Sequence, residues 1–325
     1  MPELVKTACG FALLAVLFCI SPAYAEDEGC MAVFLKAQQS FSSSNISFTA
    51  AAGDQRGMLP FTYRHLSKNA HEYALWRSLN GAVAGYALRD LSGFDFNEDR
   101  GARQPLTWRP TQVFDRLMSA KTKLQGYQCV FSGRTRLNGH RVSLIRLIPK
   151  SDQRYGFAIA LDDKYGVPVE LNVTTPSGAG IFKISATDVR NDVSGDNEFS
   201  DAEFDHFALS KPAGQKNLEP WGFIKIPRYF HMMSEGSVQM DDGNVSPYQQ
   251  FSDGLFSFRV YINSRSSLYL QEVSAGTLSV YRTQDANREY AVTGEIPMEL
   301  ARQVLSEVSS EQNNPDRQSG GASAR

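Results

Sequence analysis

The sequence predicts a mainly β protein of the α+β class, with a large curved antiparallel sheet followed by a smaller antiparallel sheet. Apolar and polar residues alternate in short runs along most of the chain, which is the period of half-buried strands. Asn80–Gly81 and Asn138–Gly139 separate neighbouring runs, and this dipeptide is a strong hairpin signal. Helical periodicity is confined to short segments. Strands joined by hairpins are therefore favoured over alternating strand–helix units.

Residues 1–25 have the features of a secretory signal peptide. Ala8–Ile20 is an apolar run of 13 residues, too short to span a bilayer. Ala23, Tyr24 and Ala25 supply a small-x-small cleavage site, so the mature chain is expected to begin at Glu26. No later segment has the 18 apolar residues typical of a membrane span. The sequence thus predicts an exported protein.

One helix and a long run of strands are expected in a first domain, residues 26–204. The helix covers Met31–Phe41, with Phe34, Ala37 and Phe41 on one face. A second helical segment is expected within Pro110–Gln125. The strand-like runs are Ile46–Ala50, Leu59–Leu66, Glu72–Leu79, Ala82–Asp90, Cys129–Arg136, Arg141–Ile148, Tyr155–Leu161, Val167–Thr174 and Gly180–Val189. A sheet that curls round a helix leaves an apolar concavity.

A second domain is expected over residues 221–310, after a linker at 205–220 that lacks apolar periodicity. A closing helix is expected at Met298–Val308, where Pro297 precedes a face of apolar residues. Residues 311–325 are polar and rich in Gly and Ser, which is typical of a disordered tail. The expected strands are Phe223–Ile226, Met232–Met240, Tyr248–Ser252, Leu255–Asn263, Ser267–Val273, Thr277–Thr283 and Arg288–Gly294.

Composition and motifs argue against several classes of function. The formal net charge is −2, which gives no electrostatic basis for nucleic-acid binding. The sequence contains no P-loop, G-x-G-x-x-G, G-x-S-x-G or H-E-x-x-H motif. The five histidines have no metal-ligand spacing with the cysteines. We therefore expect no catalytic residues, no cofactor and no metal; a hydrolase with a dispersed site is the only enzymatic alternative.

Two cysteines, Cys30 and Cys129, remain in the mature chain. In an oxidising compartment such a pair can form a disulfide, worth about 4–5 kcal/mol in the chain-entropy model. Two buried thiols fit the sequence equally well, since spacing alone does not bring the two Cα atoms together. Both alternatives stay open at this point.

Several phrases of the sequence resemble the RseB/MucB family of periplasmic regulators of the sigma-E envelope stress response. They are RYGFAIALDDKYGVPVELNVTTPSG at Arg154–Gly178, FSDGL at Phe251–Leu255, VYR at Val280–Arg282 and VTGEIP at Val292–Pro297. The resemblance implies a first domain shaped as a half-barrel, similar to periplasmic lipoprotein carriers. It also implies a second domain that binds an anti-sigma factor.

The resemblance implies a negative regulator. Its partner would be the periplasmic domain of a membrane-bound anti-sigma factor similar to RseA or MucA, which it would shield from proteolysis. Lipopolysaccharide or another lipid would bind the regulator and release that partner. The alternative is a periplasmic lipid or lipoprotein carrier without a regulatory partner. A homo-oligomer is compatible with both functions.

Two sets of candidate binding residues follow. Arg and Tyr are frequent interface anchors, so the polar face of the run at Leu255–Asn263 is a candidate contact surface, although an ordinary solvated face would look the same. The partner-binding candidates are Phe251, Asp253, Leu255, Arg259, Tyr261, Tyr281 and Arg282. The resemblance to lipoprotein carriers implies a lipid cleft lined by apolar residues of the first domain, although a closed core would have the same sequence pattern. The lipid-cleft candidates are Phe34, Trp76, Leu88, Phe131, Ile145, Phe157 and Ile181.

Overall fold

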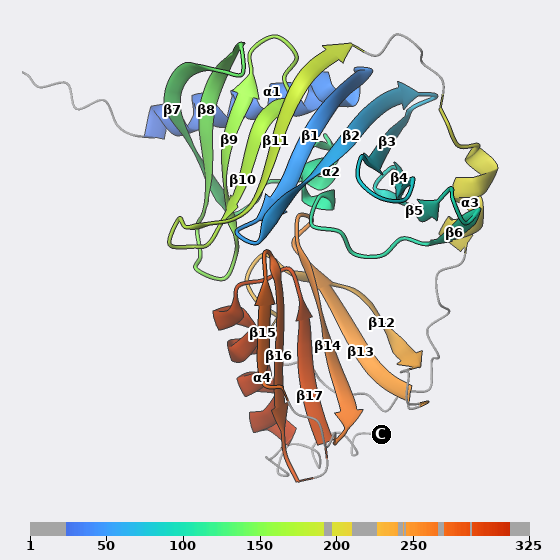
Figure 1. Ribbon diagram of the computed structural model, residues 1–325. Helices are drawn as coiled ribbons and strands as arrows, with labels where there is room; N and C mark the ends of the chain where they lie inside the picture. The colour runs from blue at the N-terminus through green and yellow to red at the C-terminus, as the bar shows by residue number, and fades with distance from the viewer. Residues whose placement is uncertain are drawn as a thin grey trace, which may run out of the picture.

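The computed structural model describes residues 24–191, 197–209, 226–239, 243, 245–265, 270–286 and 288–312. These residues form a large and a small antiparallel sheet, placed one above the other in Figure 1. The prediction of a mainly β fold, with a curved antiparallel sheet and a smaller sheet closed by a helix, is confirmed. Within the described residues, no helix combines the length and the apolar character needed to cross a membrane.

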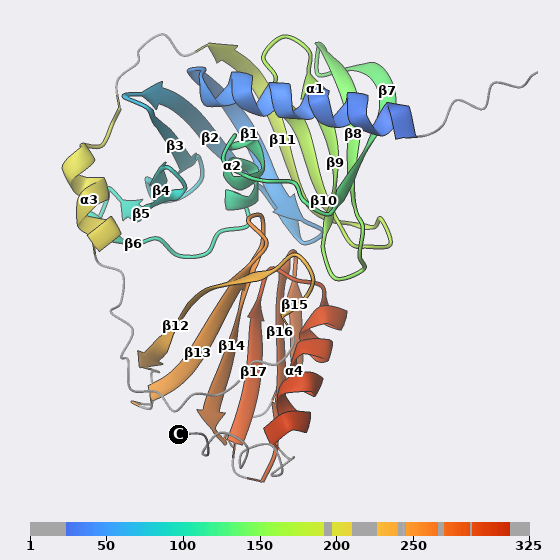
Figure 2. The ribbon, with the colours of Figure 1, turned by 180° about the vertical axis from the view of Figure 1, so that it is seen from behind.

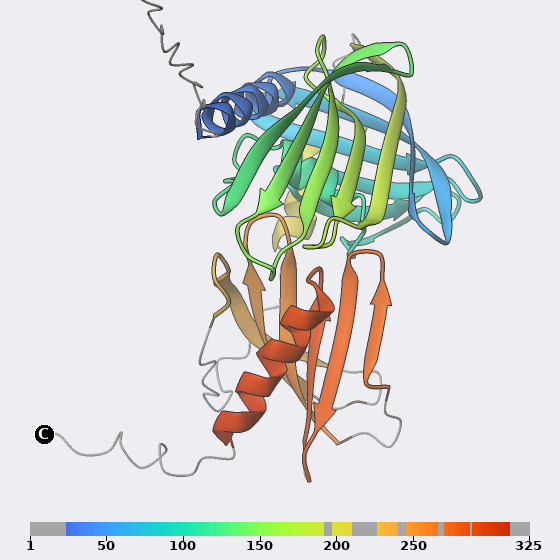
Figure 3. The same ribbon diagram turned by 90° about the vertical axis from the view of Figure 1, so that its left-hand side faces the viewer.

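The large sheet has 11 strands in the order β6-β5-β4-β3-β2-β1-β11-β10-β9-β8-β7. Its strands are β1 (Ile46–Asp54), β2 (Gly57–Lys68), β3 (His71–Ser78), β4 (Ala84–Arg89), β5 (Ser92–Asn97), β6 (Ala102–Pro105), β7 (Tyr127–Leu137), β8 (His140–Pro149), β9 (Gly156–Asp162), β10 (Pro168–Thr174) and β11 (Gly180–Asn191). The sheet is open and strongly curved (Figure 3). Strands β1–β6 form one meander and β7–β11 form a second. The two meet at the centre of the sheet, where β1 pairs with β11.

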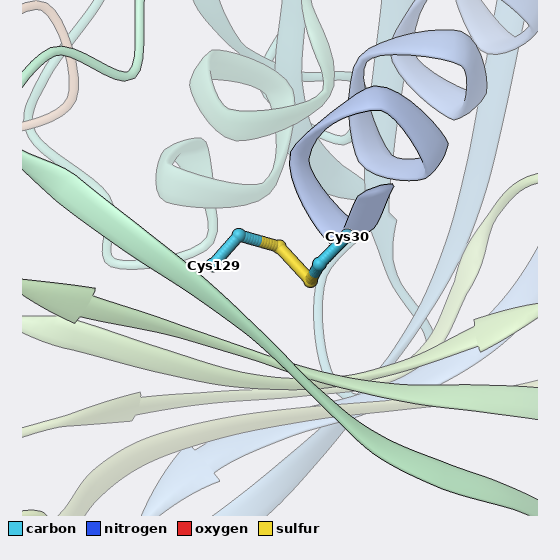
Figure 4. The surroundings of a disulfide bond; sticks show 2 residues. All are labelled: Cys30 and Cys129. Carbon is cyan, nitrogen blue, oxygen red and sulfur yellow. A yellow bond between two sulfur atoms is a disulfide. The ribbon is translucent and has the colours of Figure 1, made fainter. Parts of the chain in front are cut away.

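Two helices fill the concave side of the large sheet. Helix α1 (Tyr24–Ser42) crosses the strands from β7 to β1, and α2 (Gln112–Met118) lies beside it (Figure 2). Phe34, Ala37 and Phe41 of α1 are buried in the main core, as the helical spacing predicts. A disulfide joins Cys30 of α1 to Cys129 of β7, with a Cα–Cα distance of 5.6 Å (Figure 4). The disulfide fixes the start of the helix to the edge of the sheet.

A third helix, α3 (Asp201–Leu209), was not expected. It packs against β5, on the side of the large sheet opposite α1 and α2 (Figure 1). Its Phe204 joins Phe94 and Phe199 in a small separate core, and Arg89 forms an ion pair with Asp205. The expected linker at residues 205–220 thus begins inside this helix. Residues 210–220 lie outside the described part of the chain.

The small sheet has six strands in the order β12-β13-β14-β17-β16-β15, with α4 (Met298–Gln312) on one face. Its strands are β12 (His231–Gln239), β13 (Val245–Ser252), β14 (Ser257–Ser264), β15 (Glu272–Ala275), β16 (Leu278–Gln284) and β17 (Arg288–Gly294). Leu300, Val304 and Leu305 of α4 are buried against this sheet, in agreement with the helical pattern. Most of the strand expected at Phe223–Ile226 falls outside the described residues, as do residues 1–23 of the expected signal peptide and residues 313–325 of the expected tail. The last two residues of the expected signal peptide belong to α1, and the first two of the expected tail belong to α4.

Candidate functional site

The loop between β13 and β14 reaches from the small sheet into the core of the large sheet. Leu255 and Phe256 at its tip are fully buried and belong to the main core cluster of the first domain. The ring of Phe256 stacks on Phe157 of β9, with centroids 5.7 Å apart and planes inclined by 9°. The carboxylate of Asp253 accepts the backbone N–H groups of Leu255 (2.9 Å) and Phe256 (2.7 Å). This turn fixes the loop in its inserted shape.

A buried ion pair holds the same loop at the junction between the two sheets. Arg154 Nε donates to Asp253 Oδ2 at 2.6 Å, and the two side chains are 1% and 0% exposed. The Arg154 guanidinium also donates to the Gln125 carbonyl at 2.7 Å. It lies 4.2 Å from the ring centroid of Tyr127 and 5.2 Å from that of Tyr229. A buried charge with this many partners is strongly specific for one arrangement of its neighbours.

Further polar contacts extend the junction. Arg116 of α2 forms a second ion pair with Glu295 at 2.7 Å, and burial raises the pKa of that carboxyl. The Tyr155 hydroxyl donates to the carbonyl of Ile296 at 2.7 Å. At Gly126, which has a φ of +77°, a Cβ would come within 2.6 Å of the Tyr229 ring. Side-chain packing and hydrogen bonds therefore fix how the two sheets meet.

A cavity of about 470 Å³ lies at the same junction. Apolar side chains dominate the lining from the first domain, including Leu59, Phe61, Trp76, Tyr86, Trp108 and Phe182. Ala275 and Gly276, in the turn between β15 and β16, contribute the wall from the small sheet. Arg56 and Arg109 supply cationic groups, and each also contacts a carboxylate of the large sheet. The volume and the apolar lining are those of a small-molecule or acyl-chain site.

A buried carboxylate supports the wall of this cavity. Asp115 of α2 accepts hydrogen bonds from Trp76 Nε1 and the Tyr63 hydroxyl, both at 3.0 Å. The Tyr86 hydroxyl donates to Thr111 Oγ1 at 2.8 Å. Burial raises the pKa of Asp115 to about 7, although the donors oppose this shift. The indole ring that lines the cavity is thus held by a group that titrates near neutral pH.

Asp115 should make stability depend on pH. Its unfolded pKa is about 4, so between pH 4 and 7 the folded protein binds more protons than the unfolded chain. The Asp115 contribution to the free energy of unfolding then falls by about 1 kcal/mol per pH unit as pH rises. Burial lowers the pKa of His65 from its usual 6.5 to about 4. His65 therefore has the opposite effect, and its contribution to the free energy of unfolding falls as pH drops below 6.5.

The variant Asp115→Asn separates these two effects. Its free energy of unfolding, minus that of the wild type, should rise by about 1 kcal/mol per pH unit between pH 4 and 7. Urea denaturation at closely spaced pH values measures this difference, and the His65 contribution cancels because both proteins contain that residue. A difference that does not change with pH would contradict the role given to Asp115.

The lipid-cleft candidates lie in four different environments. Trp76 lines the cavity. Phe131 is 39% exposed, because it lies at the β-bulge of the edge strand β7. Ile181 is partly buried at the edge of the main core. The remaining candidates are buried in that core and do not line the cavity: Phe34, Leu88, Ile145 and Phe157.

The partner-binding candidates divide in a similar way. Asp253 and Leu255 are buried because the loop that carries them is inserted at the junction, whereas Phe251 of β13 is buried in the core beneath α4. In this arrangement they contact the chain's own residues and are not available to a partner. Tyr281 packs against the core beneath α4. The remaining candidates are Arg259, Tyr261 and Arg282.

Arg259, Tyr261 and Arg282 share the face of the small sheet opposite α4. Tyr261 and Arg282 pair with the same residue of β17, Ala291, from its two sides. The Arg259 guanidinium lies 4.7 Å from the ring centroid of Tyr248. All three side chains are partly exposed. They are the sequence candidates that a partner could reach in this arrangement.

Several residues of the junction were not singled out from the sequence. Arg154 and Tyr155 open the first resemblance phrase, and Glu295 and Ile296 lie within the last one. The phrases that carry the resemblance thus meet in space, where FSDGL contacts RYGF across the junction. Their co-occurrence in one sequence was the only signal that could have identified them.

Comparisons with known proteins agree with this architecture. The model of the MucB/RseB N-terminal domain matches residues 31–206, and that of the MucB/RseB C-terminal domain matches residues 215–309. The sigma-E factor regulatory protein RseB of Escherichia coli K12 is 22% identical over 276 residues, covering 82% of this chain and 86% of the relative. Its Haemophilus influenzae counterpart is 22% identical over 309 residues, covering 91% and 96%.

Two solved structures show a similar fold. The MucA/MucB complex of Pseudomonas aeruginosa matches with a TM-score of 0.61 at 16% identity, covering 86% of this chain and 96% of the matched one. A crystal structure of MucB matches with a TM-score of 0.55 at 16% identity, covering 85% and 96%. Both matches extend over the large and the small sheet, since either sheet alone is shorter than the matched length.

Proposed function

This chain belongs to the MucB/RseB family, and we propose that it is a periplasmic negative regulator of the sigma-E envelope stress response. It would bind the periplasmic domain of a membrane-bound anti-sigma factor and shield it from proteolysis. The observation that carries the proposal is the match of both family domains along one chain. The names of its relatives support it, since RseB is a sigma-E regulatory protein and MucB was solved with MucA.

The open face of the small sheet is the proposed contact surface for the anti-sigma factor. Arg259, Tyr261 and Arg282 lie together on this face, and Arg and Tyr are common interface anchors. The α4 side is occupied by the chain's own helix. The partner would thus bind within the C-terminal part of the chain, as expected from the sequence.

Lipid would bind in the cavity at the junction. Its apolar lining suits an acyl chain, and Arg56 and Arg109 suit an anionic headgroup such as that of lipopolysaccharide. Because both sheets contribute to its wall, an acyl chain in the cavity would favour one relative position of the two sheets. A lipid can release the partner only if it binds the free regulator more tightly than the complex. The junction is the structural element that could produce this difference.

Calorimetry can test both the partner and the lipid. The periplasmic domain of the anti-sigma factor should bind, and a lipopolysaccharide fragment should weaken this binding about 5- to 150-fold. By reciprocity, the anti-sigma domain should weaken lipid binding by the same factor. Ala84→Trp adds an indole to the cavity wall and should abolish lipid binding and lipid-induced release. Ser92→Trp, at an exposed residue of β5 outside the cavity lining, is the matched control.

Each outcome distinguishes a different function. Lipid binding without affinity for the anti-sigma domain would favour a carrier that has no regulatory partner, which the cavity alone could serve. Binding of both ligands without mutual effect would rule out the release mechanism and leave the family unchanged. Unaltered lipid affinity in Ala84→Trp would place the lipid elsewhere.

A further inference from the structure

Positive charge is concentrated in one segment of a chain that is otherwise slightly acidic. Residues 116–151 contain eight Lys and Arg residues and no Asp or Glu, whereas the whole chain has a net charge of −2. Two of these cations, Arg116 and Lys121, are used in ion pairs with Glu295 and Asp90. The others are exposed on or beside the hairpin β7–β8: Lys123, Arg134, Arg136, Arg141, Arg146 and Lys150.

Three of these arginines form a cluster near the tip of the hairpin. Arg136 of β7 lies directly opposite Arg141 of β8, and Arg134 precedes Arg136 by two residues on the same strand. In the described part of the chain, none of the three has a carboxylate within 4.0 Å. Like charges that face each other across a hairpin destabilise it. The hairpin therefore retains a repulsion that an external anion would relieve.

The neighbouring acidic groups already have partners. Asp162 accepts a hydrogen bond from His140 at 2.7 Å, and Asp163 accepts one from Ser143 at 2.8 Å. Lys164, which follows them in the turn, is exposed and hydrogen-bonds Tyr165. The positive potential of the arginine cluster is thus only partly offset by its surroundings.

An exposed aromatic ring accompanies the arginine cluster. Phe131 is 39% exposed, and the Arg134 guanidinium lies 5.6 Å from its ring centroid. β7 is an edge strand, and the tip of its hairpin with β8 lies at the end of the large sheet that points away from the small sheet (Figures 1 and 3). Exposed Phe beside Lys or Arg is typical of segments that bind at a lipid–water interface. No part of the small sheet covers this end.

We propose that the β7–β8 hairpin docks the protein on the surface of an anionic bilayer. The arginine cluster would contact lipid phosphates, and the Phe131 ring would enter the boundary between headgroups and acyl chains. An acidic peptide added to the edge of β7 fits less well, because the bulge between Phe131 and Gly133 interrupts the regular ladder that a further strand needs. This surface is separate from the cavity at the junction and requires no ligand in it.

Vesicle co-sedimentation tests this proposal. The protein without residues 1–25 should bind vesicles of phosphatidylglycerol mixed with phosphatidylcholine. It should bind vesicles of phosphatidylcholine alone far more weakly. Each neutralised arginine should weaken binding about fivefold, so the triple variant Arg134→Gln/Arg136→Gln/Arg141→Gln should lose on the order of 100-fold. Added salt should weaken the wild type more than the variant. Phe131→Ser should reduce binding to both kinds of vesicle.

A matched control removes the same charge elsewhere. Lys68→Gln/Arg100→Gln/Arg265→Gln changes three exposed cations outside the hairpin and should bind the anionic vesicles nearly as the wild type does. An equal loss of vesicle binding in the two triple variants would show that binding depends on net charge alone, and would overturn the proposal. Equal binding of the wild type to both kinds of vesicle would also overturn it. Capture by immobilised polyaspartate without vesicle binding would assign the hairpin to an acidic protein partner instead.

Discussion

Removing the disulfide is expected to lower the free energy of unfolding by about 4–5 kcal/mol in the chain-entropy model. Cys30 and Cys129 are 99 residues apart, so the bond strongly restricts the unfolded chain. It also attaches α1, whose Phe34 and Phe41 fill the main core, to an edge strand. Without this bond, α1 keeps its position through noncovalent contacts alone, which include the hydrogen bonds from Gln38 to the Leu117 carbonyl and from the Ala120 N–H to Ser42 Oγ.

Urea denaturation of the double variant Cys30→Ser/Cys129→Ser measures this effect. The oxidised wild type should be more stable than the variant by the stated amount, and a reducing agent should lower the stability of the wild type alone. The variant in the presence and absence of the reducing agent is the internal control. A loss below about 1 kcal/mol would show that the helix–sheet packing, and not the covalent bond, stabilises this region.

Breaking the buried ion pair at the junction should have the next largest effect. Arg154→Met leaves Asp253 buried without its cation, which should cost about 3–5 kcal/mol because that carboxylate is 0% exposed. The small sheet is expected to separate from the large one before either sheet unfolds, since the loop at Asp253–Phe256 would no longer be held in place. Small-angle scattering should then show a larger radius of gyration.

A second substitution tests this explanation. Arg154→Met/Asp253→Leu replaces both charges with apolar groups and should recover most of the lost stability and the compact shape. Arg302→Met removes an exposed ion pair with Glu272, in which each side chain is 46% exposed, and should change stability by less than about 1 kcal/mol. If the double variant is no more stable than Arg154→Met, the unpaired charge is not the cause.

Local sequence patterns predicted the elements that depend on local rules. The turn at Asn138–Gly139 joins β7 to β8 with φ values of +50° and +83°, which suit Asn and Gly. Asn80–Gly81 lies in a longer connection between β3 and β4, so it marks a hairpin without forming a two-residue turn. The short strands β5 and β6 were missed because β5 alternates over only four residues, Phe94–Asn97, and β6 contains no large apolar residue.

The candidate site depends on contacts that no local pattern contains. Arg154 in a hairpin connection and Asp253 in a turn both look solvent-exposed in the sequence, yet they become buried because they meet across 99 residues. The apolar candidates for a cleft could not be separated from the core, since both environments select the same side chains. α3 escaped detection for a related reason, because its phenylalanines are buried only by a distant part of the sheet.

The central position of β1 in the large sheet has a consequence for folding kinetics. Ile46 pairs with Asn191, so this edge of β1 stays unpaired until a further 145 residues (191 − 46) have become available. Such distant pairing raises the contact order, and domains of high contact order fold slowly. An unpaired strand edge can meanwhile pair with other chains. The seam between β1 and β11 should therefore form late and set the folding rate, leaving the newly made chain open to aggregation or to chaperone binding until β11 arrives.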